Sequence, residues 1–362
     1  MRVLVMGGTR FNGLALVREL ARHGHDVTVL NRGQTPVDLP RGVRRLFGDR
    51  TDHEGLKEVL RHEEFDVVQD INGYSVADVQ PMIELFRGRV AHYIFASSTV
   101  IYAPSHVLPM HEWAPVDRGP RQSEYGMNKL LVEDLLFAEH RANGFPATTV
   151  AFSMVFGPNN IIPEREQRMF SRLLSGRPVL IPGDGTTLGQ VGHVDDEARA
   201  LRMVMCQPQT FGKRYNLTGK EYYSDEGYVD TFAEVLGVTP RKVHIPAAVM
   251  DDIYGDRIAL EGSTIASNIE TRTAPPRPGS NLGMVQSLIQ RLAPNLHHWN
   301  RSVLFGIDRL RQDVGWEPEY TFPAMVEQTY EWYRREGLHE SRQFDFSWED
   351  RLLERLGAEA GG

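Results

Sequence analysis

Met1-Arg-Val-Leu-Val-Met-Gly-Gly-Thr-Arg-Phe-Asn-Gly-Leu-Ala15 opens the chain and decides its fold. Residues 2–6 form a short apolar run of the kind that makes a strand buried on both faces of a parallel sheet. From Leu14 onward, apolar side chains recur at helical spacing. Gly7 and Gly13 lie between the two patterns and allow a sharp turn close to a ligand. The stretch therefore predicts a strand, a tight turn and a helix whose first N–H groups face a diphosphate.

The glycine spacing differs from that of the usual dinucleotide-binding turn. The usual pattern is G-x-G-x-x-G, whereas this chain has Arg10 at the middle glycine position, so a turn without a ligand is the alternative interpretation. Further apolar runs at 25–30, 44–50, 65–73 and 91–98 alternate with helical patterns. This alternation predicts an α/β fold with a doubly wound parallel sheet of Rossmann type. Polar residues follow these runs at the sheet edge where such folds bind ligands, which favours a ligand.

Composition places the chain among ordinary globular proteins. It has 362 residues, of which 41% are hydrophobic and 24% charged, enough for one large or two closely associated domains. Cys206 is the single cysteine, which excludes an intrachain disulfide and a cysteine-rich metal site, and His297-His298 lacks nearby carboxylates, so no metal site is predicted. The net charge of -8 makes nucleic-acid binding unlikely. No apolar run approaches the roughly 20 residues that cross a bilayer, so we expect a cytoplasmic protein without a membrane partner.

The end of the second predicted strand bears on the choice of cofactor. A dinucleotide fold that uses NAD places an acidic residue here to bind the ribose 2′-OH, whereas an arginine accommodates the 2′-phosphate of NADP. This chain has Asn31 and Arg32 at that place and no carboxylate at residues 30–33. The pattern favours NADP over NAD, with a solvated loop arginine as the alternative.

The acid–base chemistry is predicted at Tyr125 and Lys129, which follow a strand that ends in the hydroxyl groups of Ser97 and Ser98. Ser98 ends the fifth predicted strand, and Tyr125 follows it by 27 residues. Tyr125 and Lys129 are four residues apart, so they project from the same face of a helix. A lysine ammonium beside a phenol favours the phenolate and is expected to lower the pKa of Tyr125 from about 10 towards neutrality. Such a tyrosine can exchange a proton with a hydroxyl group while a nicotinamide takes the hydride.

These motifs resemble the extended short-chain dehydrogenase/reductase superfamily, which contains nucleotide-sugar epimerases, dehydratases and reductases. The similarity extends over most of the chain, through Phe156-Gly-Pro158, His193-Val-Asp-Asp196, Tyr215-Asn-Leu217 and Gly315-Trp-Glu-Pro318. It implies that a small-molecule substrate, such as a nucleotide sugar, is bound beside NAD or NADP. The site residues that it implies are Ser98, Tyr125 and Lys129 for catalysis, and Gly7, Thr9, Arg10, Phe11, Gly13, Asn31, Arg32, Asp49, Asn72 and Lys129 for the cofactor.

Some motifs are closer to one branch of that superfamily, which includes the chloroplast stem-loop-binding proteins. They lie at residues 7–11, 65–73 and 190–194. Members of that plant branch are RNA-binding relatives of the epimerases and have lost the catalytic tyrosine, whereas Tyr125 is present here. The retained tyrosine favours an enzyme, and a non-catalytic RNA-binding protein is the alternative.

Three positions depart from the pattern of the superfamily. Arg10 replaces a glycine and is expected to lie over the cofactor diphosphate, where its charge would stabilise it. Thr99-Val100 stands where 4,6-dehydratases have Asp-Glu, which disfavours dehydration, and Gly189 stands where many epimerases have an arginine for the substrate diphosphate. We therefore expect a nucleotide-sugar epimerase acting by transient hydride transfer, with an NADP-dependent reductase of a keto group as an alternative.

The resemblance and the change in sequence character together predict two lobes. We expect a dinucleotide-binding domain at 1–155, with returning segments near 190–206, and a smaller C-terminal substrate lobe at 156–337. The proline-containing stretch 250–302 is expected to be an insertion that caps the substrate or a partner subunit. The charged tail 338–362 is predicted to be an exposed helix or a contact of a homodimer.

Overall fold

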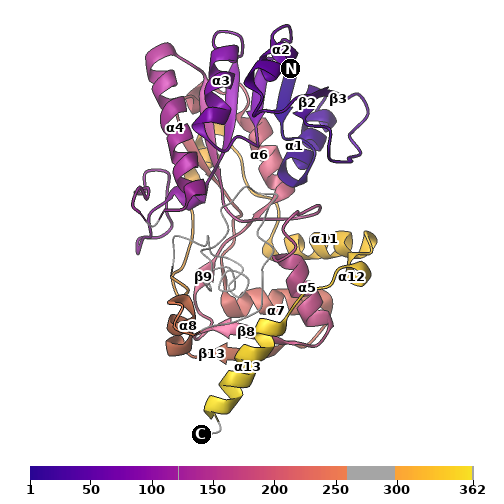
Figure 1. The fold of residues 1–362 in the computed structure, drawn as a ribbon, viewed down its shortest axis with the longest axis vertical. Helices are drawn as coiled ribbons and strands as arrows, with labels where there is room; N and C mark the ends of the chain where they lie inside the picture. The colour runs from indigo at the N-terminus through magenta and orange to yellow at the C-terminus, as the bar shows by residue number, and fades with distance from the viewer. Residues whose placement is uncertain (121, 259–297, 361–362) are drawn as a thin grey trace.

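The fold consists of two lobes, one above the other in Figure 1. The computed structural model describes residues 1–120, 122–258 and 298–360. The upper lobe holds a seven-stranded parallel sheet made of β1 (Arg2–Met6), β2 (Asp26–Asn31), β3 (Arg44–Phe47), β4 (Val67–Asp70), β5 (His92–Ser98), β6 (Ala147–Phe152) and β11 (Arg214–Leu217). The strand order is β11-β6-β5-β4-β1-β2-β3, so the chain fills the sheet outward from β1 on both sides. This order confirms the predicted doubly wound, Rossmann-type fold.

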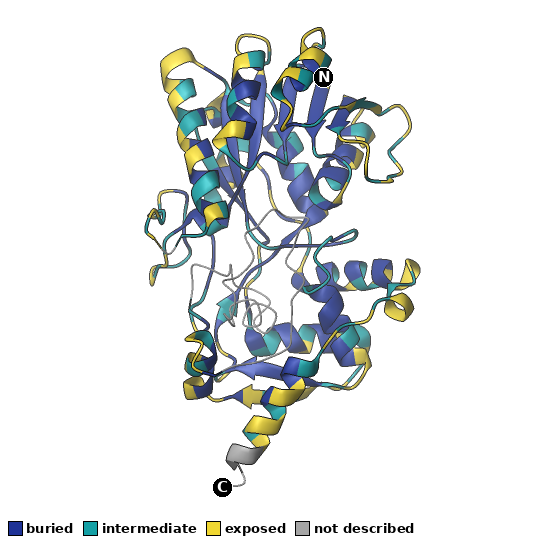
Figure 2. Ribbon diagram, viewed as in Figure 1, coloured by how far each residue is buried: buried dark blue, intermediate teal, exposed yellow. Residues whose placement is uncertain are grey.

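Strand β1 shows why both faces of this sheet are covered. The helices on the two faces are α1 (Phe11–Arg22) and α6 (Val194–Val204) on one, and α2 (His53–Leu60), α3 (Val76–Phe86) and α4 (Glu124–Asn143) on the other. Val3 and Val5 pack with α1 and α6, whereas Leu4 and Met6 pack with the other three helices. A strand covered on both sides is apolar at successive positions, as Val3 to Met6 are, and Figure 2 shows the sheet as buried.

The lower lobe is smaller and surrounds an aromatic core. Its main elements are α5 (Glu166–Leu174), β8 (Pro178–Pro182), α7 (Asp225–Leu236), β13 (Arg241–Ile245), α11 (Phe322–Arg335) and α13 (Ser347–Ala360). β8 and β13 form a parallel pair, and α5, α7 and α11 enclose a cluster that includes Phe156, Phe170 and Phe232. Strand β11 lies within the range 156–337 predicted for this lobe, yet it pairs with β6 in the upper sheet. The chain therefore returns to the upper lobe beyond residues 190–206.

The charged tail at 338–362 packs against the lower lobe. Trp348 of α13 is 1% exposed and belongs to a core cluster of this lobe. The Glu349 carboxylate accepts hydrogen bonds from Arg168 Nη2 at 3.0 Å and from Arg172 Nε at 3.1 Å, and all three side chains are buried. The tail forms the predicted helix, α13, which is exposed along much of its length, but an apolar side chain and a buried ion pair fix its first turns to the same chain. The alternative, a contact of a homodimer, stays a prediction.

The predicted insertion at 250–302 is described only at its two ends. Residues 259–297 lie outside the described residues. The first end begins within α8 (Ala247–Tyr254). At the other end, Trp299 donates from Nε1 to Asp251 Oδ1 of α8 at 2.7 Å. This hydrogen bond joins the two ends.

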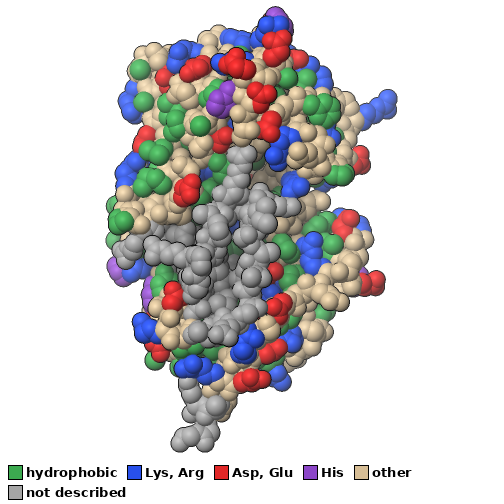
Figure 3. All heavy atoms as spheres, in the orientation of Figure 1, with side chains coloured by type: hydrophobic (Ala, Val, Ile, Leu, Met, Phe, Trp, Pro, Cys, Tyr) green, Lys and Arg blue, Asp and Glu red, His purple; other side chains and the backbone are tan. Residues whose placement is uncertain are grey.

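The molecular surface carries charge of both signs. On the face shown in Figure 3, Lys and Arg side chains are interspersed with Asp and Glu. Within the described ranges, no cluster of His, Cys, Asp and Glu side chains is suited to hold a metal ion. None of the helices in these ranges combines the length and the apolar character that crossing a membrane requires.

Candidate active site

The turn between β1 and α1 forms one wall of the candidate cofactor site. Gly7 has φ of +94°, and a Cβ atom at Gly13 would lie 2.1 Å from the Gly7 carbonyl oxygen, so neither position tolerates a side chain. Thr9 is half-buried within the turn, and Phe11 is buried in the core with φ of +33°. No side chain caps the start of α1 at Arg10. The first N–H groups of α1 therefore have no capping side chain, an arrangement that suits a phosphate group.

The loop after β2 is held by an arginine that the sequence analysis did not predict. The Asn31 Oδ1 atom accepts hydrogen bonds from Arg45 Nε at 3.1 Å and from Arg45 Nη2 at 2.7 Å. Arg45 Nη2 also donates to the Thr35 carbonyl at 3.2 Å, and Arg10 Nε donates to Thr35 Oγ1 at 3.2 Å. Arg32 is exposed and forms no hydrogen bond with the described residues. The structure thus gathers Arg10 and Arg45 beside this loop.

A buried ionic network around Arg50 and Asp70 contacts the glycine turn through Asn72. Arg50 Nη1 and Nη2 donate to the two Asp70 carboxylate oxygens, each at 2.8 Å, and the Tyr93 hydroxyl donates to Asp70 Oδ2 at 2.5 Å. Arg50 Nη1 also donates to Asn72 Oδ1 at 2.5 Å. A Cβ atom at Gly7 would lie 2.8 Å from Asn72 Cβ. Asn72, a predicted cofactor residue, is therefore packed directly against the turn.

The three predicted catalytic residues come together at the carboxyl edge of the sheet. Ser98 is the last residue of β5, and its side chain neighbours the Tyr125 phenol. Lys129 follows one helical turn later in α4, with Nζ 5.6 Å from the centroid of the Tyr125 ring. Its ammonium donates to the carbonyl oxygens of Gly73 at 2.7 Å and Ala96 at 2.6 Å. Residue spacing therefore places the pair correctly, but the ammonium is directed at backbone carbonyls.

The pKa values of Tyr125 and Lys129 differ from those that the sequence predicts. The sequence predicts that Lys129 lowers the pKa of Tyr125, whereas burial raises the pKa of Tyr125 above its ordinary value and the neighbouring Tyr74 raises it further. Lys129 is 3% exposed, and burial lowers its own pKa to about 7. The prediction is wrong for the protein alone because desolvation favours the neutral form of both groups. The neighbouring Ser98 hydroxyl and the charge of Arg165 lower the pKa of Tyr125, but they do not offset burial.

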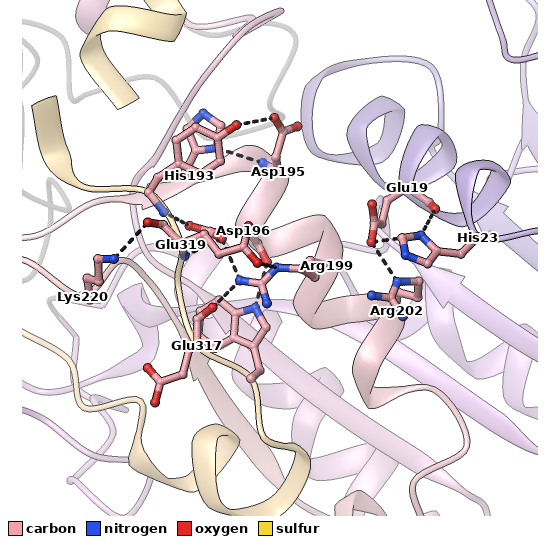
Figure 4. Close-up of polar contacts among 12 residues, drawn as sticks. Glu19, His23, His193, Asp195, Asp196, Arg199, Arg202, Lys220, Glu317 and Glu319 are labelled. Atoms are coloured by element: carbon pink, nitrogen blue, oxygen red, sulfur yellow. Dashed lines mark hydrogen bonds and ion pairs between the residues drawn. The ribbon is translucent and has the colours of Figure 1, made fainter. Parts of the chain in front are cut away.

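Two further motifs of the resemblance, 193–196 and 315–318, meet where the C-terminal segment contacts α6, as Figure 4 shows. The Asp196 carboxylate accepts a hydrogen bond from the Glu319 backbone N–H at 2.9 Å. The Trp316 indole donates to the Asp196 carbonyl at 3.1 Å and is completely buried. These motifs fasten the C-terminal segment to the sheet-covering helix and lie apart from the acid–base group.

A set of ionisable residues on the other side of the site was not predicted. Arg165 precedes α5 and donates from Nη1 to the Val155 carbonyl at 3.2 Å. Glu166 is completely buried and accepts hydrogen bonds from Asn160 Nδ2 at 2.8 and 3.0 Å. Glu197 is 1% exposed, and within the described residues neither of its carboxylate oxygens has a hydrogen-bond partner. Burial raises the pKa of both carboxyl groups, that of Glu166 to about 7.

Glu166 is expected to make the protein less stable as pH rises. Its pKa is about 7 in the folded state against an ordinary value of 4.5, so the folded state binds more protons between these values. The free energy of unfolding should therefore fall across that range, by up to about 1.4 kcal/mol per pH unit for one group. Glu166→Gln should flatten this slope in urea unfolding curves, whereas Glu327→Gln, at an exposed position, should keep it. An unchanged slope in Glu166→Gln would contradict the assignment.

Comparison with known protein families shows which family the chain belongs to. The sequence model of the NAD dependent epimerase/dehydratase family matches residues 3–218, which contain the glycine turn, Ser98, Tyr125 and Lys129. The chain belongs to this family. This match confirms the predicted membership of the extended short-chain dehydrogenase/reductase superfamily.

Two relatives illustrate the range of proteins that this chain resembles. The chain is 35% identical over 257 residues to the chloroplast stem-loop binding protein of 41 kDa b from Arabidopsis thaliana, a match that covers 67% of this chain and 65% of that protein. It is 26% identical over 250 residues to the 2′-dehydrokanamycin reductase of Streptomyces kanamyceticus, covering 68% and 70%. The chain thus spans about two thirds of the length of these relatives.

Solved structures of the family share the fold. The UDP-glucose 4-epimerase of Thermotoga maritima, solved with UDP-glucose, matches with a TM-score of 0.69 at 18% identity, covering 93% of this chain and 99% of that one. The UDP-glucuronic acid 4-epimerase of Bacillus cereus, in complex with NAD, matches with a TM-score of 0.67 at 18% identity, covering 94% and 100%. At this identity the likeness concerns the fold alone.

The residues at the turn and at the end of β2 fit the family's dinucleotide. The uncapped start of α1 suits a diphosphate, and a side chain at Gly13 would fill the close contact that shapes the turn. Two buried amide atoms, Asn12 Oδ1 and Asn31 Nδ2, have no hydrogen-bond partner in the described ranges. Asp49, predicted to contact the adenine, accepts hydrogen bonds from Thr51 at the loop after β3. This donor and acceptor set suits NAD or NADP.

Proposed function

We propose that this protein is a nucleotide-sugar epimerase in which Tyr125 is the acid and base. The observation that carries the proposal is the contact between the Ser98 side chain and the Tyr125 phenol at the carboxyl edge of the sheet, with Lys129 behind them. Ser98 would hydrogen-bond the reacting oxygen of the sugar, and Tyr125 would take its proton and return it. Lys129 would hold the nicotinamide ribose. The bound dinucleotide supplies the hydride acceptor and donor.

The class of substrate rests on the relatives, on one departure from the pattern of the dehydratases and on the charge of the chain. Relatives include UDP-glucose 4-epimerases, with 28% identity for the protein from Lactobacillus helveticus. Thr99-Val100 lacks the acid and base that elimination of water requires, which disfavours dehydration. The mixed surface charge and the net charge of -8 speak against RNA as the principal partner.

NADP-dependent reduction of a keto group is the second candidate, and the loop after β2 favours it. Arg10 and Arg45 converge on Thr35, Arg32 is exposed nearby, and residues 31–35 contain no carboxylate. An arginine cluster without a carboxylate suits the 2′-phosphate of NADP. Gly189 stands where many epimerases have an arginine that binds the substrate diphosphate. This difference also favours a reductase over a nucleotide-sugar epimerase.

The dinucleotide content of freshly purified protein separates the two candidates. An epimerase returns the hydride to the same substrate and needs no cofactor release, so tightly retained NAD in the mass spectrum would support epimerisation. A reductase must release its cofactor in every cycle, so freely exchanging NADP would support reduction. Failure of both dinucleotides to bind would overturn both assignments.

The arginine cluster predicts which cofactor binds more tightly. Arg45→Ala and Arg32→Ala should each weaken NADP binding by roughly 10- to 100-fold, because each removes a charge-assisted contact of about 1.5–3 kcal/mol. NAD affinity should stay nearly unchanged, as measured by calorimetric titration. Arg41→Ala, at another exposed arginine of the same connection, is the matched control. Equal losses for NAD and NADP in Arg45→Ala would mean that Arg45 only supports the loop through Asn31.

A further inference from the structure

The side-chain nitrogen of Lys129 lies among three aromatic rings. Nζ is 4.5 Å from the centroid of the Phe95 ring, 5.2 Å from that of Tyr74 and 5.6 Å from that of Tyr125. All three distances are within the roughly 6 Å over which the face of an aromatic ring attracts a cation. Phe95 belongs to β5, Tyr74 to the loop before α3, and Tyr125 to α4 itself. We call Tyr74, Phe95 and Tyr125 the aromatic cage.

Two backbone carbonyl groups complete the surroundings of this nitrogen. Lys129 Nζ donates to the Gly73 oxygen at 2.7 Å and to the Ala96 oxygen at 2.6 Å. Gly73 directly precedes Tyr74, and Ala96 directly follows Phe95, so each of the two strand ends supplies one carbonyl and one ring. Carbonyl oxygens and ring faces both carry partial negative charge. All five of these contacts therefore favour the positively charged form of the nitrogen.

The charged side chains near Lys129 are engaged elsewhere. Those that act on it are Arg50, Asp70, Asp78 and Glu133. Asp70 binds Arg50 through both carboxylate oxygens at 2.8 Å, Asp78 Oδ1 lies 3.7 Å from Arg50 Nε, and Glu133 accepts from Arg214 Nε at 2.8 Å. Lys129 is 3% exposed, and burial by itself disfavours an ammonium. The cage and the two carbonyl groups are thus the groups in direct contact that oppose the effect of burial.

We propose that Tyr74 is a positioning residue whose ring keeps Lys129 positively charged and holds it beside Tyr125. The Tyr74 ring also packs on the Tyr125 ring, with centroids 5.9 Å apart. Its backbone N–H donates to Asp78 Oδ2 at 3.0 Å, so the start of α3 fixes the loop that carries the ring. This inference rests on the proposed function, in which Lys129 holds the nicotinamide ribose and Tyr125 exchanges the proton. One side chain from a third segment then orients both of these residues.

Carbon NMR of the lysine side chains tests this inference on the full chain without substrate or cofactor. The chain has only five lysines, at 57, 129, 213, 220 and 242, so labelling the lysine Cε atoms with ¹³C gives few signals. The Lys129 signal is the one that disappears in Lys129→Arg, and its shift with pH measures the ammonium to amine ratio. Tyr74→Leu should lower this ratio roughly three- to thirtyfold at a given pH, because it removes a cation–π contact. Tyr74→Phe keeps the ring and should retain most of it.

A role of Tyr74 in packing alone predicts a change of the opposite sign. Loss of the ring would then only admit water to the buried nitrogen, and solvation would raise the ammonium to amine ratio. A raised or unchanged ratio in Tyr74→Leu would overturn the inference. Tyr74→Met, whose flexible side chain refills the space without a ring, should show the same fall and decides the question if Tyr74→Leu does not fold.

Tyr222→Leu, at an exposed tyrosine of the lower lobe, is the control and should leave the Lys129 titration unchanged. Because no turnover is measured, an unfavourable result for Tyr74 is distinct from failure of the proposed reaction.

Discussion

Tyr125→Phe is expected to lower kcat by about 10²- to 10⁴-fold, the usual contribution of a positioned acid and base. The substitution removes only the phenolic oxygen that contacts Ser98, while the ring keeps its packing against Tyr74 at a centroid distance of 5.9 Å. The affinity for the dinucleotide should therefore stay close to that of the wild-type protein. Steady-state kinetics on the best substrate from a panel of sugar nucleotides, together with calorimetric cofactor titration, measures both quantities.

The matched control for this change is Tyr222→Phe, which removes the same atom from an exposed tyrosine of the lower lobe. It should leave kcat unaltered. A Tyr125→Phe enzyme that keeps wild-type turnover would refute the acid–base role, and a parallel loss of cofactor affinity would indicate a damaged site.

Asp70→Ala is expected to cost about 3–5 kcal/mol of folding free energy, as measured by urea unfolding. Arg50 is almost completely buried, and Asp70 supplies both of its short carboxylate contacts, at 2.8 Å each. Without Asp70 the guanidinium stays in a low-dielectric interior with Asp78 Oδ1, 3.7 Å from Arg50 Nε, as its remaining acidic contact. The Tyr93 hydroxyl loses its acceptor as well.

Glu54→Gln is the control for this prediction, because it also removes a carboxylate from an ion pair. Its side chain is 86% exposed and lies 2.9 Å from Lys57 Nζ. A solvated pair contributes about 0–1 kcal/mol, so stability should hardly change. Equal effects of the two substitutions would show that the buried network does not support the fold.

Local patterns in the sequence were sufficient for the strand, turn and helix at residues 2–22 and for placing Tyr125 and Lys129 one turn apart on the same helix. The strand is apolar at nearly every position, and the catalytic spacing is a property of one helix. Both signals depend on neighbours in the chain. They could therefore be recognised before any tertiary contact was known.

The arginines of the site could not be found in this way. Arg45 meets Asn31 because β3 pairs with β2, and the two residues are 14 positions apart. Arg50 meets Asp70 across 20 positions. Helical spacing placed Lys129 beside Tyr125, but the acceptors of its ammonium lie 33 and 56 positions away in the chain. Which partner a long side chain selects is decided by the packing of strands and loops.

The route of the chain between its lobes has a consequence for synthesis on the ribosome. The upper sheet needs β11, which ends at residue 217, and its core also includes Trp316, held by α6 through Asp196. Every residue up to Trp316 must therefore leave the exit tunnel before the cofactor lobe can close its core. The usual order in which an N-terminal domain folds before the next is translated does not suit this topology. Nascent chains should stay dependent on chaperones until residue 316 has left the exit tunnel.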